Sequence, residues 1–268
     1  MRFFSIFTRF YKHRDLIIQL TKRELEIRHK GSKLGHIWAI LSPLMMLSLY
    51  LFIFGVVFQG KFGVLKNENF FDFALALFLG LSLFNVIAET INTAPLIIVS
   101  QPNFVKKVVF PLEIIPLTKL IASLYHSMLS VFLCILLAPL GHGSFTFNIL
   151  LLPILIIPLM MLGLGLSWGI AAVGVFLKDI NHVTGFIASA LMYASAIVYS
   201  PTRVPERLWN ILKLNPIPII VNQSRTIILW NGNINYRDLL VAYISSFIIL
   251  ILGYSIFAKL RPSFAENV

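Results

Sequence analysis

The longest uncharged stretch of this chain constrains its fold more than any other feature. Between Leu120 and Leu177, 58 consecutive residues include no Asp, Glu, Lys or Arg. About 25% of the residues of an average soluble domain are charged, because its whole surface contacts water. In this chain 12% of the residues are charged and 58% are hydrophobic. An apolar solvent explains such a stretch, so we predict an all-α integral membrane protein.

The stretch is too long for one crossing, because about 20 apolar residues span a bilayer. The helix-breaking sequence PLGHGS at 139–144 divides it into two helices. The remaining apolar segments supply four more, which makes residues 1–268 a single domain of six transmembrane helices. The predicted spans are 36–58, 73–98, 114–138, 147–176, 180–200 and 238–258.

Residues 201–237 differ from the spans, because they are rich in proline and their apolar runs, Leu214–Ser224 and Thr226–Tyr236, hold only 11 residues each. Runs of that length cannot cross a bilayer, so we predict two short re-entrant helices that enter from outside. We expect their basic residues to sit at the outer interface or along a wet path; these are Arg203, Arg207, Lys213 and Arg225. The candidate residues of an external gate are Trp209, Asn215 and Pro216.

The distribution of positive charge predicts the orientation. Nine of the 22 Lys and Arg residues lie in residues 1–33, directly before the first span. With the N-terminus inside, the cytoplasmic segments carry fifteen of them and the external segments seven. Basic residues favour the cytoplasmic side, so we predict that both termini are cytoplasmic and that residues 1–33 lie at the membrane surface. The net charge of +11 therefore points to lipid and not to nucleic acid.

Motifs for phosphate binding and catalysis are missing from the sequence. There is no GxxxxGK[ST], HExxH, CxxC or GxSxG pattern, so we predict a chain that is not an enzyme, carries no cofactor and is driven from another chain. Glu89 and His126 are the few ionisable residues inside the spans. We interpret Glu89 as a residue near the cytoplasmic headgroups, and the alternative is a polar channel lining.

Four segments resemble the polysaccharide-export permeases, the membrane subunits of type-2 ABC exporters for O-antigen, capsule and teichoic acid chains. Residues 28–38 read RHKGSKLGHIW and are followed by SPL, residues 104–111 read FVKKVVFP, residues 176–180 read FLKDI, and YSP at 199–201 precedes VP and NP. The resemblance covers nearly the whole chain in the same order. This chain departs from the family pattern at His29, where the family usually has Tyr, and at YSP. The resemblance therefore does not define the substrate in detail.

The resemblance implies the permease subunit of an ATP-driven exporter of lipid-linked polysaccharide in the bacterial inner membrane. It implies a homodimer that carries two copies of a separate ATPase, which binds the ATP and Mg²⁺, and an N-terminal interface helix. One alternative is a type-2 exporter of a drug or small lipid, and a remote one is a membrane-embedded enzyme acting on lipid-linked sugars. Substrate would enter beside Arg28, Lys30, Lys33 and Trp38.

The segment 101–112 has the form of an ATPase contact. Pro102 and Pro111 bracket a helix too short to span, with apolar residues around two lysines. Such a short helix can bury its apolar residues in a cleft of the ATPase while its lysines pair with acidic groups. The alternative is that the lysines only set topology and bind anionic lipid. The predicted coupling residues are Phe104, Val105, Lys106, Lys107, Val108, Lys178 and Asp179.

Two further patterns lie inside the spans. Tyr50, Phe54 and Phe58 share a helix face at four-residue spacing. Because sugars pack their C–H faces on aromatic rings, we predict a channel lining, with lipid contact or helix packing as the alternative. Gly165 and Gly169 form a GxxxG pattern, which predicts close helix packing within the chain in preference to a dimer contact.

Overall fold

The computed structural model describes residues 5–58, 60–106, 110–200, 204–212 and 214–268. Every regular element in these residues is a helix, which confirms the all-α class. Five helices are long and apolar enough to cross a membrane, and four of the six predicted spans match one of them closely at both ends. The fifth match is the last span, which continues past residue 258.

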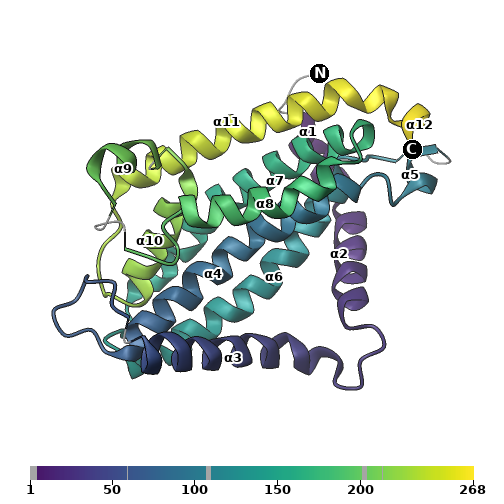
Figure 1. Ribbon diagram of the computed structural model, residues 1–268. Helices are drawn as coiled ribbons and strands as arrows, with labels where there is room; N and C mark the ends of the chain where they lie inside the picture. Colours follow the sequence, from purple (N-terminus) through teal and green to yellow (C-terminus); the bar gives the residue numbers. More distant parts are fainter. Residues whose placement is uncertain (1–4, 59, 107–109, 201–203, 213) are drawn as a thin grey trace.

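Of the five long helices, α4, α6, α7 and α11 run side by side through the molecule, and α3 lies along the bottom of the view and diverges from them toward its start (Figure 1). Their bounds in chain order are α3 (Trp38–Tyr50) with the π-helix η2 (Leu51–Val57); α4 (Phe70–Thr93) with η3 (Ala94–Leu96); α6 (Ile114–Leu137) with η4 (Ala138–Leu140); η5 (Phe147–Leu151) with α7 (Leu152–Phe176); and α11 (Tyr236–Leu260) with η7 (Arg261–Ser263) and α12 (Phe264–Asn267).

The span predicted at 180–200 is shorter than expected. Its helix, α8 (Ile180–Ala194), has 15 residues, or a length of about 22 Å against a hydrocarbon core of about 30 Å. The chain leaves the helix at Ser195, and Ala196 adopts a positive φ of 48°, which an α-helix cannot include. The prediction was wrong for the last six residues of this segment.

The remaining helices gather at the two ends of the bundle. Figure 1 places the C-terminus at one end, together with α1 (Ser5–Lys12), α2 (Arg14–His29), α5 (Pro102–Lys106) and α12. At the opposite end lie α9 (Glu206–Leu212), α10 (Pro216–Ile228) and residues 60–69. A short 3₁₀ turn, η1 (Gly35–Ile37), joins the loop after α2 to α3.

The two short helices predicted in 201–237 are present, but their positions differ from the two apolar runs. α10 extends through Arg225, where we expected a break, and residues 229–235 form no helix. Asn231 has a positive φ of 51°, a conformation that ends a helix and that Asn tolerates better than most residues. The first helix, α9, lies before the first apolar run and includes Trp209.

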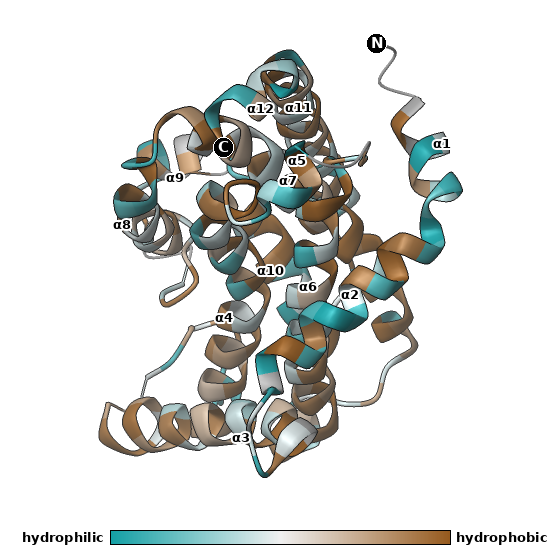
Figure 2. Ribbon diagram, turned by 90° about the vertical axis from the view of Figure 1, so that its right-hand side faces the viewer, coloured by the Kyte–Doolittle hydropathy of each residue, from teal (hydrophilic) through white to brown (hydrophobic). Residues whose placement is uncertain are grey.

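α4 is the centre of the bundle. Of its most apolar stretch 78% is buried, against 11% for α3, and α4 packs against α3, α6, α7, α8 and α10. Its first turn is fixed by a capping box, in which the Asn69 side chain accepts from Asp72 N at 2.9 Å and Asp72 Oδ2 accepts from Asn69 N at 2.8 Å. The residues of α3 are mostly hydrophobic, whereas α2 combines hydrophobic and hydrophilic residues (Figure 2).

The GxxxG pattern lies in the contact between α7 and α11. A methyl group on Gly165 would lie 2.6 Å from the carbonyl oxygen of Ile249, and Gly253 on α11 meets Gly165 directly. The two backbones can therefore approach only because neither residue has a side chain. This confirms that the pattern serves packing within the chain.

Candidate functional site: a polar cavity beside α4

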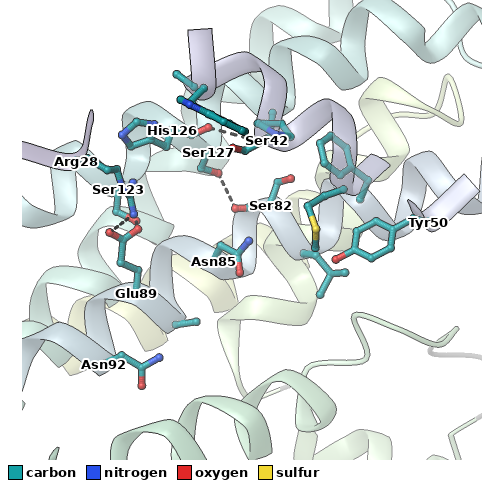
Figure 3. Close-up of a pocket in the computed structure, with 18 of the residues that line it drawn as sticks. Arg28, Ser42, Tyr50, Ser82, Asn85, Glu89, Asn92, Ser123, His126 and Ser127 are labelled. Atoms are coloured by element: carbon teal, nitrogen blue, oxygen red, sulfur yellow. Dashed lines mark hydrogen bonds and ion pairs between the residues drawn. The ribbon is translucent and has the colours of Figure 1, made fainter. Parts of the chain in front are cut away.

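A cavity of about 690 Å³ opens between α2 and α3 on one side and α4 and α6 on the other. Figure 3 shows the side chains that point into it. For a protein with so few polar residues, its lining is unusually rich in hydroxyl, amide and charged groups. Polar groups in an apolar bundle are costly to bury, so a cavity with this lining is a candidate for a wet path or a ligand site.

Two polar stripes from α4 and α6 form the floor of the cavity. On α4 the residues are Ser82, Asn85, Glu89 and Asn92, and on α6 they are Ser123, His126, Ser127 and Ser130. Both sets recur at intervals of three and four residues, which keeps them on one helix face. From the sequence we identified only Glu89 and His126 as ionisable residues inside the spans. The same helical spacing would also have revealed the other six polar residues of the two stripes.

An ion pair closes the end of the cavity nearest α2. Arg28 Nη2 lies 2.5 Å from Glu89 Oε1, and Ser123 Oγ donates to Glu89 Oε2 at 2.8 Å. The Arg28 and Glu89 side chains are 40% and 35% exposed, so both remain accessible to a ligand. Pairing lowers the cost of two opposite charges beside the membrane. Glu89 thus lines this cavity and contacts α2 through Arg28. Its position relative to the headgroups and its place in a channel stay predictions.

The rest of the cavity combines hydrogen-bonding groups with aromatic rings. Ser127 Oγ donates to the carbonyl oxygen of Ser82 at 2.7 Å, while Trp38, Tyr50 and Phe78 contribute to the apolar side of the lining. The Tyr50 and Phe78 ring centroids are 6.5 Å apart. Hydroxyls and amides can exchange hydrogen bonds with ligand hydroxyls, and rings pack against C–H surfaces. Carbohydrate offers both kinds of surface.

The predicted aromatic lining is divided by the structure. Tyr50 lines the cavity. Phe54 instead packs against Phe73, with centroids 6.1 Å apart, and Phe58 is 69% exposed outside the cavity lining. Helix packing, the alternative interpretation, accounts for Phe54.

The residues predicted to meet incoming substrate also separate into two groups. Arg28 and Trp38 line the cavity, whereas Lys30 and Lys33 are exposed in the loop after α2 and do not line it. A role for the two lysines in substrate access stays a prediction.

The predicted coupling residues that the structure describes lie at the end of the bundle that holds α1 and α12. Phe104, Val105 and Lys106 belong to α5, where the Phe104 ring stacks on Phe110 with centroids 4.5 Å apart. Lys107 and Val108 lie outside the described residues. Lys178 and Asp179 are exposed in the turn between α7 and α8. Contact with an ATPase stays a prediction for all of them.

Of the predicted gate residues, Asn215 and Pro216 lie at the start of α10, and Trp209 belongs to α9. Asn215 caps this helix, accepting from Ile217 N at 3.1 Å, and its Nδ2 donates to Ser195 Oγ at 2.8 Å. Pro216 occupies the first helical position and is buried. Asn215 therefore joins α10 to the end of α8, and its role as a gate stays a prediction.

The position of Arg225 differs from our expectation that it lies at the outer interface or along a wet path. Its side chain is fully buried; Nε donates to the carbonyl oxygen of Ala76 at 2.8 Å and Nη2 to that of Ile197 at 2.6 Å. The guanidinium also lies 4.5 Å from the Phe62 ring centroid. Backbone carbonyl groups of α4 and of the segment after α8 take the place of water. They supply acceptors that the sequence pattern does not reveal.

The described residues form five long apolar helices, and three of them, α3, α4 and α6, line a polar cavity. These features define a multi-pass membrane protein with a polar site inside its helix bundle. The model of the ABC-2 type transporter family matches residues 15–229, and the chain belongs to that family. It is 26% identical over 253 residues to an O-antigen export system permease protein from Klebsiella pneumoniae, covering 94% of each chain. It is 24% identical over 261 residues to a protein of that name from Myxococcus xanthus, covering 96% of this chain and 97% of the relative. A polysialic acid transport protein from Escherichia coli is 25% identical over 206 residues, 76% of this chain and 77% of its own.

Proposed function

We propose that this chain is the permease subunit of an ATP-driven exporter of lipid-linked polysaccharide, and that the cavity beside α4 belongs to the glycan path. The observation that carries the proposal is the lining of that cavity, in which two polar stripes face an aromatic side in an otherwise apolar bundle. Relatives named as O-antigen export permeases over almost the whole chain support the same substrate class.

The assembly we propose is a homodimer with two copies of a separate ABC ATPase, which holds the ATP and Mg²⁺. Membership of the ABC-2 type transporter family supports the ATPase partner. The exposed apolar faces of α3 and α8 support a membrane-buried partner surface as well as lipid contact; on α8 these residues are Val183, Phe186, Ile187 and Tyr193. No cofactor is assigned to this chain itself.

The arrangement in the membrane completes the proposal. We place α8 as the fifth of six spans, α2 as an interface helix on the cytoplasmic surface, and α9 and α10 as re-entrant helices on the external side of the bacterial inner membrane. The clustering of α1, α2, α5 and the C-terminus at one end supports this arrangement (Figure 1), because basic residues are concentrated in those segments.

Export is tested in vesicles that contain the chain, its partner ATPase and lipid-linked O-antigen from the host strain. We expect glycan to reach the opposite face in an ATP-dependent manner. Asn85→Leu, which places an apolar side chain in the cavity, should slow export, whereas Ser255→Leu, an exposed position of α11 outside the lining, should not. Transport of a hydrophobic drug without glycan export would support the alternative exporter class instead.

The orientation is tested with single cysteines in a chain whose buried Cys134 is replaced by Ala. An impermeant thiol reagent added to intact cells should label a cysteine at Lys61 and should not label one at Glu266. Labelling at Glu266 would contradict the cytoplasmic C-terminus and the count of six spans.

A further inference from the structure

A single buried carboxylate joins three distant parts of the chain at the end of the bundle that holds α5. Glu113, directly after the coupling segment (residues 101–112), has a side chain only 2% exposed. Arg9 Nη1 from α1 lies 2.8 Å from its Oε1, and Arg261 Nη1 from η7 lies 3.0 Å from its Oε2. One side chain thus holds the N-terminal segment and the end of α11 at the same point.

The packing around Glu113 reinforces this junction. Trp168 Nε1 on α7 donates to the Glu113 carbonyl oxygen at 3.1 Å, and the Trp168 ring stacks on Phe10 of α1 with centroids 6.2 Å apart. Beyond Arg261, α12 packs against α5, and its buried Phe264 lies 6.3 Å, between centroids, from Phe176 beside the second predicted coupling loop. Both predicted coupling loops therefore connect to the same cluster.

Glu113 also stands at the start of a helix that reaches the cavity. α6 begins at Ile114 with Glu113 as its N-cap residue, where the helix dipole favours a negative charge. The same helix carries Ser123 and Ser127 into the cavity, and its Lys119 pairs with Glu24 of α2. A displacement at Glu113 is therefore passed along a continuous helix to the cavity and to α2.

The contacts of α1 and η7 at this junction depend on the negative charge of the Glu113 side chain. A buried carboxylate without partners is costly, and two arginines offset that cost from opposite sides. The arginines themselves are 29% and 32% exposed, so water can solvate them when Glu113 is neutral. Removing the negative charge thus breaks the ion pairs of α1 and η7 with Glu113. The apolar contacts around them and the hydrogen bond from Arg261 Nη2 to the Phe110 carbonyl oxygen stay in place.

We infer that Glu113 is a positioning residue that transmits movement of the coupling segment to α6, α1 and the end of α11. The inference rests on the proposed function, because the coupling segment moves only if a partner ATPase docks there. Glu113 does not line the cavity; it acts by holding α1, the start of α6 and η7 together. Its loss should lower the amount of glycan exported per ATP hydrolysed, not merely the amount of folded protein.

The test compares Glu113→Gln with Glu113→Asp and with the matched control Arg14→Gln. The Arg14 side chain is 58% exposed and contacts Asp15 and the Tyr11 ring, away from Glu113. The chain and its ATPase are placed in vesicles with lipid-linked O-antigen, and hydrolysis and export are measured on the same sample. We expect export per ATP to fall by about two- to thirtyfold in Glu113→Gln. Glu113→Asp should recover part of the loss, and Arg14→Gln should match the wild type.

The possible results distinguish a failure of the inference about Glu113 from a failure of the proposed function. If the wild type exports glycan and Glu113→Gln keeps the wild-type ratio, the inference is overturned while the proposed function stands. If the wild type exports no glycan, the proposed function itself fails. Should Glu113→Gln not insert, the double variant Arg9→Gln, Arg261→Gln breaks the same contacts from residues that are partly exposed, and an unchanged ratio there overturns the inference equally.

Discussion

Gly80 on α4 provides the sharpest test of how Arg225 is held in the core. A methyl group at Gly80 would lie 2.4 Å from Arg225 Nη2 and 3.1 Å from Val221 Cγ1. The guanidinium cannot move aside freely, because its Nη2 is bound to the Ile197 carbonyl at 2.6 Å. The change Gly80→Ala therefore forces either the loss of that hydrogen bond or a shift of α10 away from α4.

The expected cost follows from these contacts. Inserting one methyl group into a filled core destabilises a protein by about 1–3 kcal/mol, and leaving the buried carbonyl of Ile197 without a donor costs about the same. The two routes are alternatives, so the costs do not add. Alanine also favours a helix over glycine by up to about 1 kcal/mol. We expect Gly80→Ala to lower the free energy of unfolding by about 1–2 kcal/mol.

The measurement is thermal unfolding in detergent, followed by intrinsic fluorescence and by size-exclusion chromatography. The control is Gly185→Ala on α8, where an added methyl group meets nothing within 4 Å and should be neutral or stabilising. A Gly80→Ala protein as stable as this control would refute the tight packing of Arg225 against α4.

A double-mutant cycle identifies the group responsible. An Arg225→Ala background removes the tightest contact of the new methyl group and leaves the one with Val221, so Gly80→Ala should cost less than about 1 kcal/mol there. If its cost is the same in both backgrounds, the guanidinium is not what opposes the methyl group.

The remaining predictions concern other parts of the bundle. Gly165→Val should abolish the α7–α11 contact and with it most folded protein in the membrane, which a pulse-chase of membrane fractions would reveal; normal accumulation would contradict the packing. Replacing Lys106 and Lys107 by Glu should reduce pull-down of the partner ATPase without affecting insertion, and a wild-type yield would count against the coupling assignment. Asn215→Ala removes a helix cap worth about 1 kcal/mol and should make vesicles leakier to ions; unchanged conductance would argue against a gate at the start of α10.

The spans were predictable because each depends on one local property, the length of an apolar run. The helices at 73–98 and 147–176 therefore agree with the structure to within a few residues. The end of α8 was not predictable in this way, because Ala194 and Ser195 are as compatible with a membrane helix as the residues before them. Only the turn at Ala196, with its positive φ, ends the helix.

The cavity was half visible in the sequence. The stripe that includes Asn85 and Glu89 follows helical spacing, so its common face could be read directly. That Arg28 is the partner of Glu89 could not, because the residues are 61 positions apart and only the packing of α2 brings them together. The same holds for Arg225, whose acceptors are backbone carbonyl groups; every residue type has one, so no sequence pattern marks them.

The π-helix at Leu51–Val57 within the first span has a consequence for how this chain can vary in length. Each turn of a π-helix bonds residue i to i+5 and so accommodates one residue more than an α-helical turn. Deleting a single residue there would tighten the turns to α-helical form while leaving the ends of the span close to their present positions. The same deletion in α4 would rotate every later side chain by about 100° and misplace Glu89. Relatives with one residue fewer should therefore carry the gap between Tyr50 and Phe58.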